Sequence, residues 1–174
     1  MNARMPTPEG VIRNEPTPSL VLISLAVALC INLLPWQGVP LLVRPDFLLL
    51  VLIYWCMEEP HRVGATGAFF TGLLMDIAEG SLMGQNAMIY SVAAYLVLYF
   101  RLRILSFNWL LQGLHILPVL CLGQAILVLE QAFLGAAFPS PLYFLRSILG
   151  AAAWPILSWI LELARRRPQK DHLA

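Results

Sequence analysis

Long apolar stretches separated by short polar breaks run through most of this chain. Six such stretches are visible, at residues 20–35, 41–57, 63–78, 87–100, 113–133 and 142–164. A helix that crosses the hydrocarbon core of a bilayer needs roughly 20 predominantly apolar residues. The pattern therefore predicts an all-α integral membrane protein, in which six helices form one transmembrane domain over residues 19–164.

The second stretch is the least regular of the six. Arg44-Pro45-Asp46 interrupts it and leaves an unbroken apolar run only from Phe47 to Met57, which is about 16 Å long as a helix. Two interpretations are open. Either the residues before Pro45 extend the span around a turn, or the segment is a partial span, which membranes tolerate only where protein covers the backbone.

Both ends of the chain differ from the apolar stretches. Residues 1–18 are polar and contain four prolines, a composition that does not pack a core and predicts a flexible tail. Residues 165–174 begin with three consecutive arginines and predict a basic tail beside the last span. Membrane orientation and anionic headgroups explain such a cluster better than nucleic-acid binding does.

Composition excludes an ordinary soluble domain. Apolar residues make up 59% of the 174 residues and charged residues only 12%, whereas soluble domains carry about 25% charged residues. Six spans leave only short loops and two tails outside the membrane. No extramembrane enzyme domain fits in that remainder.

The distribution of basic residues predicts the orientation. If the N-terminus lies in the cytoplasm, only Arg44 and Arg146 of the 11 lysines and arginines fall on or near the outer side. The other nine fall inside, as expected because cytoplasmic loops carry an excess of Lys and Arg. Five or seven spans would separate the basic C-terminal tail from Arg4 and Arg13, so we expect six spans with both termini in the cytoplasm.

Small residues recur on one face of the third stretch. Gly64, Ala68 and Gly72 are spaced four residues apart, which places them on the same face of a helix. A face of small side chains lets another helix approach closely in a membrane. It is therefore a candidate surface for helix contact.

Charged residues within spans are costly and are candidates for a functional role. Asp76 lies near the end of the third stretch. It either lines a polar pocket or contacts a partner, or it caps or pairs within the loop that follows, and both interpretations stay open. Glu130 and Arg146 flank the turn between the last two stretches, and we expect them to form an intramembrane ion pair rather than to serve transport.

The sequence shows no catalytic or metal-binding constellation. His61 and His115 are isolated and lack further ligands at the spacing of a zinc site. There is no phosphate-binding loop, nucleophile elbow or His-Glu-x-x-His helix, and the three cysteines lack the spacing of a metal or redox motif. We therefore predict no enzyme activity, no metal and no cofactor.

Two functional classes fit a bundle with so little mass outside the membrane. One is a scaffold that recruits partners through its lateral faces, and the other is a carrier or binding subunit for a small solute or a lipid. A carrier should show convergent polar groups near the bilayer midplane, where this sequence offers chiefly Gln124 and Thr71. The scaffold is favoured, and the carrier is kept as the alternative.

Four short motifs follow one another within about residues 36–98. They are Arg44-Pro45-Asp46-Phe47 with the later Tyr54-Trp55, Pro60-His61-Arg62-Val63-Gly64, Gly72-Leu73-Leu74-Met75-Asp76 and Gly80-Ser81-Leu82-Met83-Gly84. In this order and spacing they resemble the rod-shape-determining protein MreD family of Gram-negative bacteria. The likeness extends over nearly the whole chain, and the proline-rich start is the main departure.

The resemblance implies a multi-pass inner-membrane scaffold of the cell-elongation machinery, with a role in peptidoglycan synthesis and rod-shape maintenance. The implied partners are the transmembrane helix of MreC and, indirectly, MreB filaments and RodA with its transpeptidase partner. Membrane lipid is a further expected contact, and nucleic acid is not. A six-helix fold similar to the substrate-binding subunits of energy-coupling-factor transporters is also implied, which keeps the carrier alternative open because fold does not determine function.

Positions that match the family motifs are candidates for partner contacts or for the loops that support them. These positions are Arg44, Pro45, Pro60, His61, Arg62, Gly72, Asp76, Gly80 and Gly84. The face of Gly64, Ala68 and Gly72 is expected to receive the MreC helix.

Overall fold

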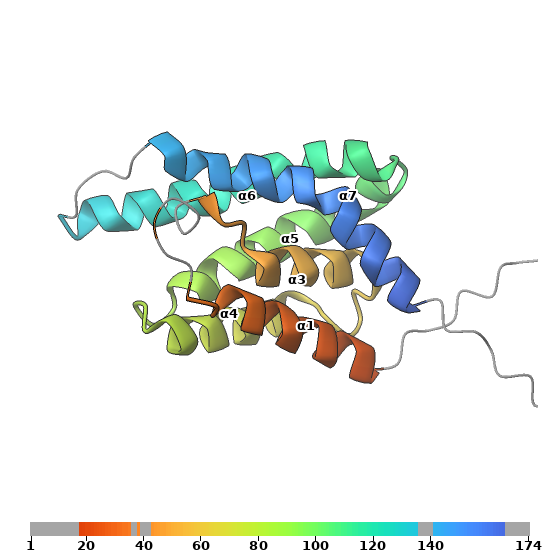
Figure 1. Ribbon diagram of the computed structural model, residues 1–174, viewed down its shortest axis with the longest axis horizontal. Coiled ribbons are helices and arrows are strands. Elements are labelled where there is room, and N and C mark those ends of the chain that lie inside the picture. The colour runs from red at the N-terminus through yellow and green to blue at the C-terminus, as the bar shows by residue number, and fades with distance from the viewer. Residues whose placement is uncertain (1–17, 36–37, 39–42, 136–140, 166–174) are drawn as a thin grey trace, which may run out of the picture.

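The computed structural model describes residues 18–35, 38, 43–135 and 141–165. Within these residues the chain forms six α-helices, one short 3-10 helix and no strand, which confirms the predicted all-helical fold (Figure 1). The elements are α1 (Pro18–Asn32), α3 (Phe47–Glu58), α4 (Ala65–Glu79), α5 (Gln85–Leu105), α6 (Trp109–Phe133), the 3-10 helix η1 (Pro141–Phe144) and α7 (Leu145–Arg165).

Three of these helices are long and apolar enough to cross a membrane. They are α5, α6 and α7, with 21, 25 and 21 residues. α1 and α3 are shorter apolar helices of 15 and 12 residues. That all six helices cross the bilayer stays a prediction, and the two predicted tails lie outside the described residues except at Pro18 and Arg165.

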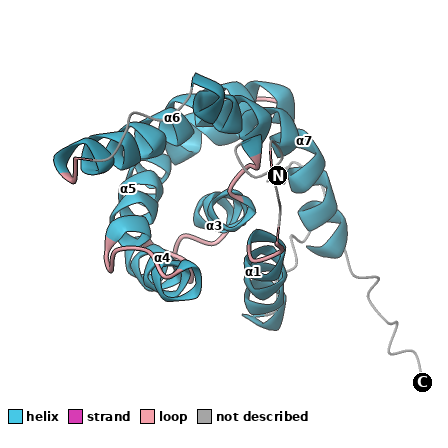
Figure 2. Ribbon diagram, turned by 60° about the vertical axis from the view of Figure 1, so that its left-hand side comes forward, coloured by secondary structure: helices cyan, strands magenta, loops and turns pink. Residues whose placement is uncertain are grey.

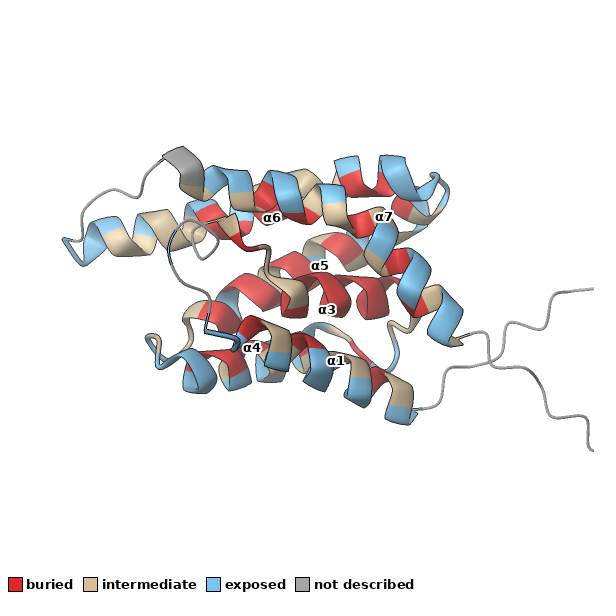
Figure 3. Ribbon diagram, viewed as in Figure 1, coloured by how far each residue is buried: buried red, intermediate tan, exposed pale blue. Residues whose placement is uncertain are grey.

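α3 lies at the centre of the bundle. Every residue from Leu48 to Met57 is buried, and Figure 2 shows the other five α-helices arranged around α3. The surrounding helices expose their outer faces, as Figure 3 shows. A helix that is apolar all round is typical of a buried position. Protein thus covers α3 along its length, as a partial span requires, whereas the alternative extension before Pro45 falls on residues 41–43, of which only Val43 lies among the described residues.

The surrounding helices form an arc in which each packs on the next, α4 on α5, α5 on α6 and α6 on α7, while α1 packs on α3. Two contacts in this arc depend on glycine. A Cβ atom at Gly72 would lie 2.5 Å from Cα of Ala87 in α5, and one at Gly113 would lie 2.7 Å from the carbonyl oxygen of Ala151 in α7. These glycines therefore determine how closely their helices approach.

The far end of α7 returns toward α3. Pro155 lies inside α7, and Figure 1 shows the helix changing direction along its length, as expected because an interior proline removes a backbone hydrogen bond and kinks a helix. Nη1 of Arg165 lies 2.6 Å from Oε2 of Glu58, and Nη2 lies 3.4 Å from Oε1 of Glu59. Arg165 thus joins the end of α7 to the end of α3.

Two glycines of α4 provide a matched test of this packing. We expect Gly72→Ala to destabilise the protein by about 1–3 kcal/mol, because the new Cβ overlaps the backbone of α5. Gly67→Ala should be neutral or stabilising, because its Cβ would meet only a Val63 methyl carbon at 3.8 Å and alanine favours a helix by about 1 kcal/mol. Thermal unfolding in detergent measures both, and equal effects would contradict the close contact.

Candidate functional site

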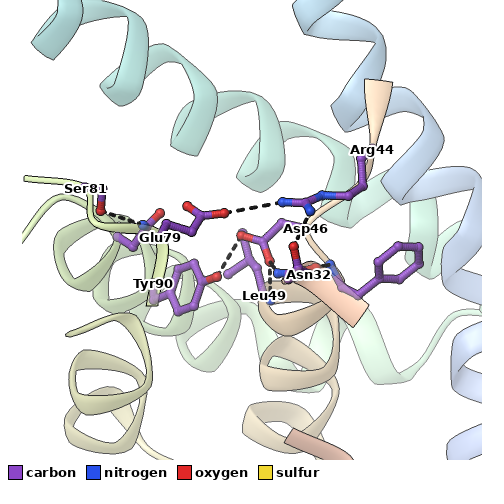
Figure 4. A network of polar contacts seen from close by, with 9 residues as sticks. Asn32, Arg44, Asp46, Leu49, Glu79, Ser81 and Tyr90 are labelled. Carbon is purple, nitrogen blue, oxygen red and sulfur yellow. Dashed lines mark hydrogen bonds and ion pairs between the residues drawn. The ribbon is translucent and has the colours of Figure 1, made fainter. Parts of the chain in front are cut away.

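One carboxylate joins three helices at the N-terminal end of α3. Oδ1 of Asp46 accepts hydrogen bonds from the backbone N–H of Leu49 at 3.0 Å and from Nδ2 of Asn32, the last residue of α1, at 2.7 Å. Oδ2 accepts a bond from the hydroxyl of Tyr90 in α5 at 2.7 Å. Asp46 therefore acts as the N-cap of α3 and also connects α3 to α1 and α5 (Figure 4).

Arg44 extends this network to α4. Its side chain is buried, Nη1 donates to the carbonyl oxygen of Asn32, and Nη2 lies 3.3 Å from Oε1 of Glu79 (Figure 4). The Nε atom has no hydrogen-bond partner among the described residues. Because a buried charge without a counter-ion is strongly destabilising, the pair with Glu79 is what allows Arg44 to lie inside the bundle.

Asp76 caps α5 from the neighbouring helix. Its side chain is buried and accepts the backbone N–H of Asn86 at 2.7 Å and that of Gly84 at 2.9 Å. The hydroxyl of Ser81 donates to the same carboxylate at 3.1 Å. The first N–H groups of a helix lack intrahelical partners and attract negative charge, and Gly84 at the N-cap has no side chain to supply it. The structure thus favours the capping interpretation of Asp76.

The motif glycines around this cap shape the turn between α4 and α5. Gly80 has φ +66° and Gly84 has φ +100°. Glycine adopts these left-handed conformations without the steric penalty of other residues. The turn brings the start of α5 within reach of Asp76.

A cavity of about 220 Å³ lies at the same end of the bundle. Residues from α3, α4, α5, α6, η1 and α7 line it, including the charged groups of Asp46, Glu79 and Arg146. Gln124, the polar residue expected near the midplane, is also in its wall. Its Nε2 donates to the carbonyl oxygen of Tyr143 at 3.0 Å and its Oε1 accepts the hydroxyl of Ser147 at 2.7 Å.

The expected ion pair between Glu130 and Arg146 is not formed in the part of the chain that the structure describes. Arg146 lines the cavity together with Tyr143, whereas Oε2 of Glu130 is buried without a hydrogen-bond partner among the described residues. The reason is the register of the helical hairpin. Because Ser147 bonds to Gln124, Glu130 lies six residues farther along α6, roughly 9 Å beyond the level of Ser147.

Three motif residues lie at the opposite end of α3. His61 and Arg62 are exposed in the turn that follows α3, and Nε of Arg62 lies 3.8 Å from Oε2 of Glu59. Gly64 is the N-cap of α4. The predicted site residues are therefore divided between the two ends of the bundle rather than gathered on one surface.

The remaining predicted residues serve helix packing. Ala68 and Gly72 are buried in α4, and Gly72 meets the backbone of Ala87 in α5. A partner helix on this face would have to displace α5. Pro45 lies near Gly150 of α7, where a Cβ added to the glycine would be 3.7 Å from Cβ of Pro45.

Four members of the network were not among the predicted site residues. Asp46, which connects the helices, belongs only to the Arg44-Pro45-Asp46 motif. Asn32 interrupts the first apolar stretch, Glu79 closes the third, and Tyr90 is one of several tyrosines in the fourth. Each is a weak signal by itself. The contacts that unite them join residues 14 to 44 positions apart, which no local pattern reveals.

The chemistry that this arrangement supports is ion pairing and hydrogen bonding. Among the described residues, no group of three or more His, Cys, Asp and Glu side chains is placed to hold a metal ion. The polar groups instead connect helices, and some of them also line the cavity.

Comparison with known proteins identifies the family. The model of the rod shape-determining protein MreD family matches residues 15–164. The chain belongs to the MreD family. The rod shape-determining protein MreD of Haemophilus influenzae is 31% identical to it over 159 residues, which cover 88% of this chain and 93% of that relative. No solved structure matches the chain, so the similarity to energy-coupling-factor subunits stays a prediction.

Membership in the MreD family implies a role in rod-shape determination. The MreD family is a family of shape-determining proteins that is not known for enzyme activity, and the three long apolar helices are those of a membrane protein.

Removal of the negative charge from Asp76 tests its capping role. We expect Asp76→Asn to destabilise the start of α5 by about 1 kcal/mol, because the amide offers one acceptor oxygen where the carboxylate offers two. Hydrogen exchange should speed up at the amides of Asn86 and Ala87. The start of α6, capped by Asn108, is the internal control, and unchanged exchange at α5 would contradict the capping role.

Proposed function

We propose that this MreD-family protein is a non-enzymatic scaffold of the cell-elongation machinery in the bacterial inner membrane. In this proposal it binds MreC and helps to couple MreB filaments, and RodA with its transpeptidase partner, to peptidoglycan synthesis. The family match over residues 15–164 is the observation that carries the proposal. The helical bundle supports it, because most of the described residues lie in helices joined by short turns, so that a partner in the membrane would meet helix faces.

We assign the MreC contact to the outer face of α4. α4 packs chiefly on α5, and Figure 2 shows it at one end of the arc of helices. Phe70, Leu74 and Ile77 are 62%, 50% and 63% exposed, and their spacing places them on one side of the helix. In lipid, helices associate through van der Waals packing of such side chains. The small-residue face of α4 is used against α5, so the partner helix is placed on the side that remains.

Site-specific crosslinking tests this assignment. A photoreactive residue at Leu74 should crosslink to MreC in membranes, whereas one at Ile156 of α7, which is 64% exposed, should not. A crosslink from Ile156 alone would move the contact to α7 and leave the scaffold proposal intact. Absence of MreC both from crosslinks and from the co-purified complex would contradict MreC binding.

The orientation is tested with two exposed positions at opposite ends of α5. In a variant without the native cysteines, we expect Met83→Cys to react with a membrane-impermeant thiol reagent from the periplasm and Ser106→Cys to remain unlabelled. Both residues are exposed in turns, and the predicted topology places the turn after α5 in the cytoplasm because Arg101 and Arg103 adjoin it. The reverse pattern would overturn the placement of both termini in the cytoplasm.

A further inference from the structure

The cavity at the N-terminal end of α3 exists because α3 is shorter than the helices that surround it. α3 has 12 residues and is about 18 Å long, whereas α6 has 25 residues and is about 38 Å long. The first turn of α3 and the longer helices beside it line this space. The cavity is partly open and has a volume of about 220 Å³, which is room for a small polar group.

Several polar groups in the wall of this cavity are already used by the protein. Asp46 accepts bonds from Asn32, Leu49 and Tyr90. Gln124 is bonded through both its oxygen and its nitrogen. These groups shape the cavity and set its charge, but they have little hydrogen-bonding capacity left for a ligand.

Arg146 is different. It lines the cavity and forms no ion pair with a carboxylate among the described residues, although Glu79 attracts it electrostatically. A guanidinium has five N–H donors and binds phosphate or carboxylate in a two-pronged geometry. Since no described carboxylate contacts Arg146 directly, its guanidinium is available to an anionic oxygen in the cavity.

The carboxylates in the cavity wall favour a positively charged group. Glu79 at the end of α4 lines the cavity together with Asp46, and its one identified ion pair is the contact of 3.3 Å with Arg44. An anion alone would be repelled by these two carboxylates. A cation alone would be repelled by Arg146. A molecule that carries both charges complements Arg146 as well as the two carboxylates, and it keeps the cavity close to neutral.

We propose that this cavity binds a zwitterionic group, with an oxyanion on Arg146 and an ammonium toward Glu79. Two sources have this chemistry, the headgroup of a zwitterionic phospholipid and a free zwitterion from solution. The proposal does not depend on the scaffold role, because it concerns the chain by itself.

Binding is tested on the purified full-length protein in detergent with two probes. Native mass spectrometry measures retention of phosphatidylethanolamine against phosphatidylglycerol, which lacks the ammonium, and calorimetric titration measures binding of free phosphoethanolamine. Preferential retention of phosphatidylethanolamine assigns the site to a lipid headgroup. Binding of phosphoethanolamine without that preference assigns it to a soluble zwitterion.

Two charge variants test the orientation of the ligand. We expect Arg146→Gln to weaken binding of the zwitterionic probe at least tenfold, because it removes the partner of the oxyanion. Glu79→Gln should reduce the preference for phosphatidylethanolamine over phosphatidylglycerol, because it removes the partner of the ammonium. Since Glu79→Gln also leaves Arg44 without its ion pair, the folded fraction is measured in parallel.

A third variant blocks the cavity without removing a charge. Gln131 lines the cavity from α6, so Gln131→Trp should abolish binding. Leu129→Trp is the matched control, because Leu129 is 59% exposed on the same helix and is not part of the cavity wall. If neither probe binds the unmodified protein, or if binding survives both Arg146→Gln and Gln131→Trp, the proposal is overturned.

Discussion

The ends of α3 lie inside the bundle, where the helix's unpaired backbone groups and neighbouring charges must find partners within the protein. At its start, Asp46 caps the helix and Asn32 accepts the N–H of Phe47. At its end, Nε of Arg101 donates to the carbonyl oxygen of Met57, and Arg165 pairs with the acidic residues that follow. The positions of α1, α5 and α7 therefore follow from polar contacts with α3 as well as from apolar packing.

Because α3 is enclosed by the other helices, the protein has two kinds of surface, one outside the bundle and one inside it. The outer faces of the surrounding helices are apolar and exposed, which suits a protein that meets lipid and the helices of partners. The inner space left by the short central helix is polar and charged. The proposed scaffold role uses surfaces of the first kind. The polar interior is an additional property that the scaffold role does not account for.

The helices were largely predictable, because each depends on a local run of apolar residues. The ends of the helices were less predictable. The fourth stretch was expected to end at Phe100, but α5 continues to Leu105. Arg101 belongs to the helix because its Nε donates a hydrogen bond to the carbonyl oxygen of Met57 inside the bundle. The site was predictable only in part. Arg44 stands out beside a proline and was predicted, whereas the role of Asp46, its bond to Tyr90 and the register that separates Glu130 from Arg146 arise from tertiary packing.

The shortness of α3 also bears on how the protein is made. A segment of 12 residues is too short to be recognised as a span by its own length, and its backbone is satisfied only once protein surrounds it. The long helices α5, α6 and α7 can enter the bilayer individually, but α3 reaches its place only together with the helices that enclose it. The insertion of α3 is therefore coupled to that of the helices that enclose it, and the bonds made by Asp46, Arg44 and Arg165 depend on their assembly.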